Sequence, residues 1–295
     1  MKFNEKFTVD KNYANTRIDR WLKLNTQKFP QSFVEKLLRS GKIKVNNKKI
    51  KSSYKLQLED EIFLQFNYEE KKENEKYSAN LKEYKEIRNN IIFENHDYLI
   101  LNKPSGISVQ SGTKSPKNLI DILNKFSEDK KFYLVHRIDK ETSGIIVFAC
   151  NRLFAQTLSE QFRNKEVKKS YLAILYGSIP LNEGTLDHDL VFKVKNQLKT
   201  FKAETDFSVL SKNKDFSYVE ATPITGRKHQ IRQQFFKVNH PIVGDRKYEI
   251  PHYVNKDKFL MLHSYKITFY DKGKEKTFKV EPPKEFKNFL KKSNL

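Results

Sequence analysis

A charged segment with few aliphatic residues, from Tyr68 to Asn90, divides this chain of 295 residues into two parts. The segment holds six basic and six acidic residues, and Glu69–Lys76 within it is charged at seven of eight positions. A stretch of this composition cannot bury enough apolar surface to join a folded core, so it is typical of a solvated linker. We therefore predict a small domain at residues 1–67, a charged linker at residues 68–89 and a larger domain at residues 90–295.

The first part, residues 1–67, has the pattern of two short helices followed by a hairpin. Apolar residues spaced three and four apart predict the helices: Ile18, Trp21 and Leu22, then Phe33, Val34, Leu37 and Leu38. Gly41 lies where a glycine commonly ends a helix. The segment Ile43–Ile50 predicts two short strands around a turn at Asn46-Asn47, with lysines alternating with aliphatic residues on the first strand. One face of this hairpin is then apolar and the other is cationic.

Residues 16–64 resemble the S4 RNA-binding domain. The matching elements are Arg17-Ile18-Asp19 on the first helix, Leu37–Gly41 at the end of the second, and Lys42–Asn46 at the start of the hairpin. The resemblance implies an RNA ligand but no reaction. The basic residues expected to contact RNA are Arg17, Arg39, Lys42, Lys44, Lys48 and Lys49. The alternative for this region is a small basic helical module with a solvated lysine face.

The net charge of +21 and the pI near 9.7 favour a polyanion as the partner. Residues 1–67 contribute +8 of that charge, from 15 basic and 7 acidic residues. A coat of lysine that serves only solubility, or a lysine-rich bias of composition, would give the same total. Charge alone therefore leaves both interpretations open.

Several other classes of protein are disfavoured. The longest apolar run, Gly144–Cys150, is far shorter than the ~20 residues that span a bilayer, and the N-terminal residues lack the apolar stretch of a secretory signal. Cys150 is the single cysteine, so it forms no intramolecular disulfide, fits a reducing cytoplasm and is expected to be a buried small hydrophobe. No histidine pair has metal-ligand spacing alongside cysteines. We expect neither a metal nor a membrane partner.

From about residue 90 onward, strands dominate the pattern. The predicted strands are residues 90–95, 98–101, 132–135, 145–148, 170–175, 203–210, 218–222 and 266–270. Two helices are predicted by Phe154, Leu158 and Phe162, and by Ile231, Phe235 and Val238. Together these elements predict a strand-rich α+β domain.

The polar segment His136–Gly144 lies between two of the apolar strands. By itself it is consistent with a simple turn, yet it places the carboxylate of Asp139 close to Arg137, a pairing that can hold an acid ionised. Its pattern, His-Arg-Ile-Asp-x-x-Thr-Ser-Gly, resembles the signature of the RluA-type pseudouridine synthases. The resemblance implies that Asp139 is the catalytic aspartate. It also implies that Arg137 fills the stack position vacated by a flipped base.

Further segments match this family in order. Asn102–Val109 resembles the segment before the signature, Lys169–Gly177 the second motif, and Thr225–Arg232 the third. The matches place Tyr171 as the active-site tyrosine and Arg232 as the arginine that pairs with the aspartate. Three shorter matches follow, namely His240-Pro241-Ile242, Gly244-Asp245 and Leu262-His263.

Two departures lie outside the proposed catalytic residues. Gln110 and Ser264 stand where the family pattern has His and Ala. The order of S4-like domain, linker and catalytic domain most resembles the branch that acts on large-subunit ribosomal RNA (RluC-like).

The resemblance implies isomerisation of uridine to pseudouridine, which is redox-neutral and needs no cofactor, metal or ATP. Asp139 would act as a nucleophile or as a base, and the residues leave these alternatives open. Arg232 would keep Asp139 ionised, while Tyr171 would stack on the uracil and assist removal of the proton from C5. His136 and His229 have no evident orienting partner in the sequence, so we interpret both as structural or RNA-contacting.

Two rival functions remain. One is a non-catalytic RNA-binding or ribosome-assembly protein with a relic active site, against which the intact Asp139, Tyr171 and Arg232 weigh. The other is a synthase that acts on transfer RNA. The favoured expectation is a monomeric cytoplasmic enzyme that modifies ribosomal RNA of the 23S type.

Overall fold

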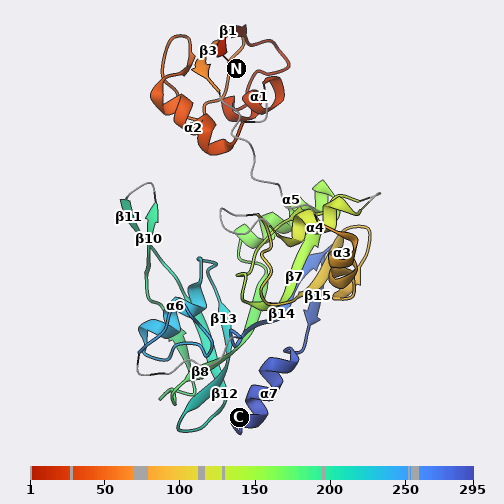
Figure 1. The fold of residues 1–295 in the computed structure, drawn as a ribbon, viewed down its shortest axis with the longest axis vertical. Coiled ribbons are helices and arrows are strands. Elements are labelled where there is room, and N and C mark those ends of the chain that lie inside the picture. The colour runs from red at the N-terminus through yellow and green to blue at the C-terminus, as the bar shows by residue number, and fades with distance from the viewer. Residues whose placement is uncertain are drawn as a thin grey trace. The chain divides into compact units, whose positions relative to one another are not determined.

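The computed structural model (Figure 1) describes residues 2–26, 29–68, 79–111, 117–127, 130–194, 197–251, 253 and 259–295. The chain forms two units, Met1–Lys76 and Tyr77–Leu295. The charged run Glu69–Lys76, predicted to be linker, lies outside the described residues. Among the described residues, no helix has both the length and the apolar character needed to cross a bilayer.

The first unit packs two helices against a three-stranded antiparallel sheet. Its elements are β1 (Lys2–Thr8), α1 (Ile18–Asn25), α2 (Gln31–Ser40), β2 (Ile43–Val45) and β3 (Glu61–Asn67), with strand order β1-β3-β2. The two predicted helices are confirmed. The residues of their apolar stripes that form the core are Ile18, Trp21, Leu22, Val34, Leu37 and Leu38. Gly41 ends α2 with φ of 72°, a conformation that glycine adopts without strain.

The predicted second strand of the hairpin is wrong. Asn46 and Asn47 do form the turn, with φ of 48° and 59°, and Val45 and Lys48 exchange two backbone hydrogen bonds across it. Beyond Lys48 the pairing stops, and β2 pairs instead with β3. The reason is apolar burial: this register sets Ile43 opposite Leu64 and Val45 opposite Ile62, whereas Lys48-Lys49 offers no apolar side chain to the core.

The second unit is built on a ten-stranded mixed sheet. The path runs β4-β5-β7-β14-β8-β13-β12-β9, with β15 paired to β14 and β6 paired to β7. The strands of this path are β4 (Ile91–Glu94), β5 (Tyr98–Lys103), β7 (Ser143–Ala149), β14 (Leu262–Asp271), β8 (Lys168–Tyr176), β13 (Phe216–Pro223), β12 (Thr205–Lys212) and β9 (Glu183–Leu186); the two strands off it are β15 (Lys274–Lys279) and β6 (Tyr133–Leu134). The strand-rich α+β class is confirmed.

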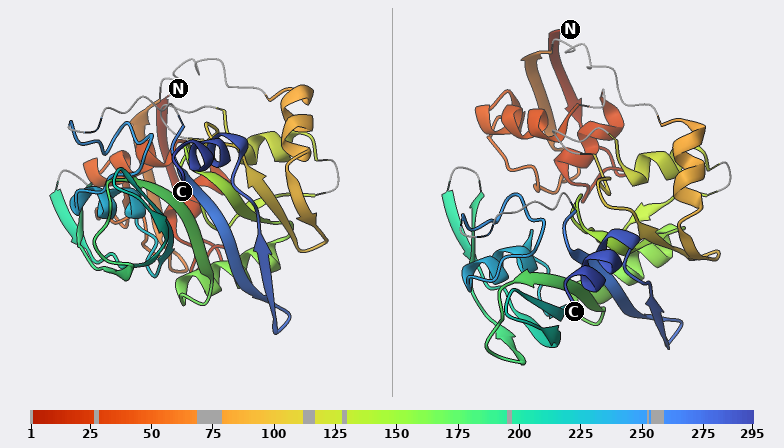
Figure 2. Two further views of the ribbon diagram at one scale, coloured as in Figure 1. Left: turned by 90° about the horizontal axis from the view of Figure 1, so that it is seen from below. Right: turned by 60° about the horizontal axis from the view of Figure 1, so that its bottom comes forward.

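Helices cover both faces of this sheet at β7, which explains why this strand is apolar at every position from Ile145 to Ala149. On β7, Ile145 and Val147 face a cluster that includes Phe154 and Leu158 of α5 (Arg152–Arg163). The alternate residues of β7 face a second cluster, to which α4 (Leu119–Lys125) and α7 (Lys284–Lys292) contribute. Figure 2 shows α7 lying across the sheet. Cys150, just past β7, is buried as expected.

Several elements were not predicted from sequence. The helix α3 (Leu81–Arg88) lies in the range assigned to the linker, and it forms because Asn80 and Glu83 make a capping box and Ile87 is buried. The helices α4 and α7, the strands β9 and β15, and the separate hairpin of β10 (Leu190–Val194) and β11 (Gln197–Phe201) were also missed. The predicted helix around Ile231 is α6 (Gln230–Lys237).

A buried histidine joins the central strands. His263 on β14 is 0% exposed, its Nε2 lies 3.0 Å from the carbonyl oxygen of Val280, and its Nδ1 lies 2.9 Å from Oγ of Ser143 on β7. Burial lowers the pKa of His263 to about 4, although the bond to the Val280 carbonyl acts in the opposite direction. The ring is therefore neutral at neutral pH, with Nε2–H donating to Val280 and Nδ1 accepting from Ser143.

Acid should destabilise the fold through this histidine. An unfolded histidine binds a proton below a pKa of roughly 6.5, whereas folded His263 does so only near 4, so stability is lost as pH falls from about 6.5 toward 4. By about pH 5 the loss from His263 should reach about 2 kcal/mol. Urea unfolding at about pH 7 and pH 5 measures this loss of stability. The free energy of unfolding of His263→Gln should depend less on pH than that of the parent.

The matched control is His188→Gln, because His188 is exposed. If His263→Gln keeps the full pH dependence of the parent, the acid sensitivity comes from other groups.

Candidate active site

The loop between β6 and β7 carries Asp139 to one cleft on the second unit. The cleft has about 500 Å³ of empty volume, open to solvent, and its lining includes Arg137, Asp139, Tyr171 and Arg232. These residues come from the loop before β7, from β8 and from α6, so the structure brings together all four candidates that the sequence placed in the catalytic domain.

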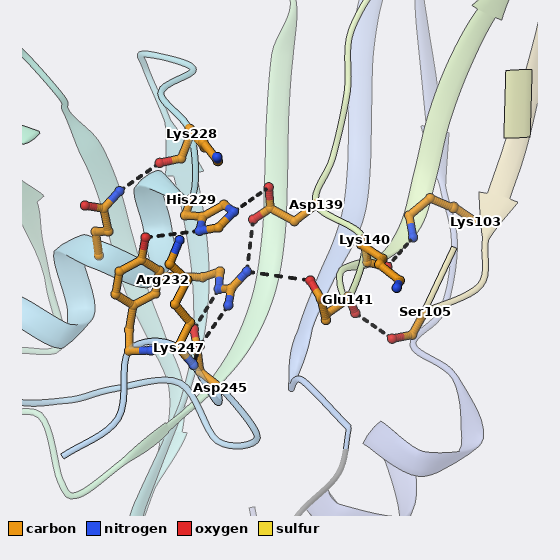
Figure 3. A network of polar contacts seen from close by, with 12 residues as sticks. Lys103, Ser105, Asp139, Lys140, Glu141, Lys228, His229, Arg232, Asp245 and Lys247 are labelled. Carbon is orange, nitrogen blue, oxygen red and sulfur yellow. Dashed lines mark hydrogen bonds and ion pairs between the residues drawn. The ribbon is translucent and has the colours of Figure 1, made fainter. Parts of the chain in front are cut away.

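The segment before the signature holds the Asp139 loop in place. The Nζ of Lys103 donates to the carbonyl oxygens of Pro104, Ile107 and Lys140 at 2.8, 3.0 and 2.9 Å. The Gly106 N–H also donates to Lys140, at 2.8 Å. The Ser105 hydroxyl donates to the carbonyl of Glu141 at 2.6 Å (Figure 3). Burial lowers the pKa of Lys103 to about 7. These bonds fix the backbone immediately after Asp139.

Gly144, the last residue of the signature, allows the loop to enter the sheet. It has φ of 105°, and it pairs with Ser264 where β7 and β14 run parallel. A Cβ at this position would overlap the backbone of Ser264. Only glycine allows so close an approach of two strands in this backbone conformation.

Arg232 is clamped mainly by Asp245, a contact that the sequence did not indicate. Its Nε and Nη2 donate to the two carboxylate oxygens of Asp245 at 2.7 and 2.8 Å, and both side chains are buried. Its Nη1 lies 3.4 Å from Oδ2 of Asp139 and 3.9 Å from Oε2 of the more exposed Glu141 (Figure 3). The pairing of Arg232 with Asp139 is present, but it is the longer contact. Burial disfavours the arginine cation, yet the hydrogen bonds and charge of Asp245 outweigh it and raise the pKa of Arg232.

The turn that carries Asp245 is itself constrained. Asp245 also accepts from the backbone N–H groups of Lys247 and Tyr248, at 2.9 and 3.1 Å. Gly244 has φ of 80°, and a Cβ there would overlap the carbonyl of Phe259. Gly244 is therefore required because the backbone passes too close to Phe259 for a side chain, and Asp245 follows with its carboxylate held by backbone N–H groups. Nothing in the local sequence pattern shows that this carboxylate reaches α6.

His229, interpreted from the sequence as structural or RNA-contacting, is a second neighbour of Asp139. Its Nε2 lies 3.7 Å from Oδ1 of Asp139, and its Nδ1 lies 3.0 Å from the hydroxyl of Tyr248. The Tyr248 ring lies 5.4 Å from the guanidinium of Arg232. Burial lowers the pKa of His229, and the cations Arg232, Lys247 and Lys228 act in the same direction while Asp139 opposes them. The ring is neutral at neutral pH. His229 thus has the orienting partner that sequence reasoning could not find, because Tyr248 lies on a separate loop.

His136, the other sequence candidate, is structural. Its Nε2 accepts from the backbone N–H of Val147 at 2.9 Å, and its ring stacks on Phe162 with centroids 4.8 Å apart. Burial lowers the pKa of His136 to about 3. A neutral ring with its acceptor nitrogen engaged by the sheet is not placed to exchange protons in the cleft.

Tyr171 contributes an aromatic ring to the cleft wall. Burial raises its pKa to about 12, with Asp139 acting in the same direction and a hydrogen bond to Ser264 in the opposite one. The side chain is therefore a neutral phenol at neutral pH. Ile138, Ile231 and Leu262 add apolar surface beside it. This wall suits a flat ring, while Asp139 supplies a carboxylate at its edge.

Cationic groups surround the cleft. Arg137 is exposed, and Arg227 lies over the ring of Phe201 at 5.5 Å while its Nε donates to the carbonyl of Lys202. Lys169 is half-buried, and burial lowers its pKa. Among the described residues, no group of three His, Cys, Asp or Glu side chains could hold a metal ion.

The basic residues predicted on the first unit are mostly exposed. Arg39, Lys42, Lys48 and Lys49 are exposed and Lys44 is half-buried. Arg17 differs because its guanidinium donates to both carboxylate oxygens of Asp19, at 3.1 and 2.7 Å. It is the one member of this predicted set whose charge is already paired by a carboxylate.

The chain is similar to known proteins over both of its units. The family described as RNA pseudouridylate synthase matches residues 97–237, and the S4 domain matches residues 16–62. The ribosomal large subunit pseudouridine synthase C of Buchnera aphidicola subsp. Baizongia pistaciae (strain Bp) is 33% identical over 300 residues, covering 96% of this chain and 95% of that protein. The protein of the same name from Vibrio cholerae is 34% identical, covering 94% and 92%. The solved structure of human RNA pseudouridylate synthase domain containing 4 matches with a TM-score of 0.62 at 25% identity, over 72% of this chain and 96% of that chain. Both resemblances noted in the sequence are confirmed.

The buried pair of Arg232 and Asp245 should be strongly coupled energetically. Either Arg232→Met or Asp245→Asn leaves a buried partner without its counter-charge and should lower the free energy of unfolding by roughly 3 kcal/mol. The double variant should lose less than the sum of the two, by at least about 1 kcal/mol. Urea unfolding of the four proteins measures this coupling.

The control is Asp215→Asn, because Asp215 is exposed and its loss should change stability by less than about 0.5 kcal/mol. Strictly additive single effects would mean that the two side chains do not depend on each other.

Proposed function

The chain belongs to the RNA pseudouridylate synthase family, and we propose that it isomerises uridines of large-subunit ribosomal RNA to pseudouridine. The observation that carries the proposal is the carboxylate of Asp139, held 3.4 Å from a buried arginine in a cleft with an apolar wall. The choice of ribosomal RNA is supported by relatives that are named for the large subunit and that match almost the whole chain.

The proposed chemistry needs groups that the cleft provides. The C1′–N1 bond of uridine breaks, the uracil turns, a C1′–C5 bond forms, the C5 proton leaves and N1 gains a proton, so nothing is oxidised or reduced. Asp139 starts the reaction as a nucleophile or as a base, and either role requires the charged form. The fixed cation of Arg232 lies 3.4 Å from the carboxylate and anchors it.

The other residues of the cleft would bind and position the base. Tyr171, a neutral phenol, stacks on the uracil. Removing the target base from its stack costs a few kcal/mol. Arg137 is exposed at the rim of the cleft, and we propose that it offsets this cost by filling the gap in the RNA stack.

The S4 domain would supply a second RNA contact. Its exposed cations Arg39, Lys42, Lys48 and Lys49 can neutralise phosphates, which releases counterions and strengthens binding independently of sequence. Lys44 and Arg17 would contribute less, since one is half-buried and the other is paired with Asp19.

We also propose that the protein works as a monomer in the cytoplasm. The proposal is supported by the cleft itself, whose lining brings Asp139, Tyr171 and Arg232 together from one chain. The cytoplasmic location follows from the proposed substrate, because ribosomal RNA lies in the cytoplasm of bacteria. Size-exclusion chromatography at the concentrations used for turnover tests the monomer directly, and a dimer would contradict it.

Replacing the carboxylate should abolish the reaction without unfolding the protein. Asp139→Asn keeps the shape and removes the charge, so pseudouridine formation on ribosomal RNA should fall more than about a hundredfold, or roughly 2.7 kcal/mol of barrier. Mapping of pseudouridine in bulk RNA incubated with each protein gives both the rate and the substrate. Asp215→Asn is the control and should remain active.

Two results would contradict parts of this proposal. An Asp139→Asn protein within about tenfold of the parent would remove Asp139 from the chemistry. Modification confined to transfer RNA would keep the reaction but replace the substrate.

The S4 domain can be tested without deleting it. Neutralising Lys42, Lys48 and Lys49 to Gln should weaken binding to ribosomal RNA and make the dependence of log affinity on log salt shallower by roughly 2. The control changes three exposed lysines of the other unit, Lys274, Lys279 and Lys291, to Gln. If both triple variants give the same slope of log affinity against log salt, the lysines contribute through the overall charge of the protein and not through a contact of the S4 domain.

A further inference from the structure

Thr142, a residue of the cleft lining, has a buried hydroxyl without a hydrogen-bond partner among the described residues. The residue is 2% exposed, it lines the same cleft as Asp139, and its Oγ1 makes no hydrogen bond to any residue that the structure describes. Native proteins leave few buried polar atoms unpaired, because each costs folding free energy. The next residue illustrates the usual outcome, since the Ser143 hydroxyl lies 2.9 Å from Nδ1 of His263.

The other such atom in the described part of the chain lies elsewhere. It is Oγ of Ser211, beside the bulge of β12, and it does not line the cleft. Unpaired hydroxyls at these two positions therefore differ in one respect. Only Thr142 belongs to the lining of the cleft where a substrate would lie.

We propose that the Thr142 hydroxyl hydrogen-bonds the flipped uridine. This inference rests on the proposed function, which supplies the ligand. Thr142 follows Asp139 by three residues, and the bonds from Lys103, Ser105 and Gly106 hold the backbone between them at Lys140 and Glu141. The hydroxyl is thus fixed relative to the carboxylate, and the unpaired state in the free protein is relieved when the nucleotide binds.

A hydroxyl suits a base that must turn. The threonine hydroxyl can donate to a uracil carbonyl or accept from the N3–H, so it can bind either an acceptor or a donor on the edge of the base. The fixed carboxylate of Asp139 can only accept, and the guanidinium of Arg232 can only donate. After the C1′–N1 bond breaks, Thr142 can therefore keep one hydrogen bond while the ring changes the edge that it presents. The ribose 2′-hydroxyl is the other partner of the same chemistry.

The inference predicts opposite effects on stability and on turnover. Thr142→Val keeps the shape and removes the hydroxyl, so the free protein should gain about 2–4 °C in Tm. The value of kcat/KM for pseudouridine formation should fall about tenfold to a hundredfold, because the bound uridine loses a hydrogen-bonding partner. Thr142→Ser should restore most of the activity. A merely structural threonine would not give this combination.

Ser211→Ala is the matched control. It removes the other unpaired hydroxyl and should raise Tm without changing kcat/KM. An RNA substrate with 2′-deoxyuridine at the target position then identifies which atom of the uridine the Thr142 hydroxyl binds. If the parent and Thr142→Val become equal on it, the partner is the 2′-hydroxyl, and if the difference persists, the partner is on the base.

Two results would overturn the inference. One is a folded Thr142→Val protein with kcat/KM within about twofold of an active parent. The other is a lower Tm for Thr142→Val, which would show that the hydroxyl has a partner in the free protein. A parent that makes no pseudouridine overturns the proposed function and this inference together, so the two failures are distinguishable.

Discussion

The buried ion pair between Arg232 and Asp245 is the constraint on which the site depends. An arginine taken out of water needs a counter-charge in fixed geometry, and the two short bonds from Asp245 provide it. With two of its nitrogens engaged, the guanidinium has Nη1 left to face Asp139 at 3.4 Å. Asp245 is in turn anchored by backbone N–H groups of its own turn. The electrostatics near Asp139 are therefore set by the fold before any RNA arrives.

A second constraint fixes the loop on which Asp139 lies. Lys103, Ser105 and Gly106 bind the backbone just after it, and Gly144 admits the loop to the sheet through a contact that no side chain would allow. Because β7 is buried on both faces, this attachment is rigid. The carboxylate and the Thr142 hydroxyl are thus held on a rigid scaffold, which is what preorganised catalysis requires.

The sequence predicted those parts of the molecule that local patterns determine. Apolar spacing located α1, α2, α5 and α6, and motif order selected Asp139, Tyr171 and Arg232, which line one cleft in the structure. It failed where long-range pairing decides the outcome. The strand predicted after Asn47 does not form, because β2 pairs with β3, where Ile62 and Leu64 lie opposite its apolar residues. The contact of Asp245 with Arg232 and the pairing of Tyr248 with His229 were missed because contacts between distant segments leave no periodic signal.

A structure of the protein bound to ribosomal RNA with 5-fluorouridine at the modified position tests the central claim most directly. Fluorine at C5 leaves no proton to lose there, so the reaction should stall with the base in the site. The account predicts the ring turned out of the RNA stack and seated between Asp139 and Tyr171, with the Arg232–Asp245 pair intact. A ring still stacked in the RNA, or seated away from Asp139, would contradict it.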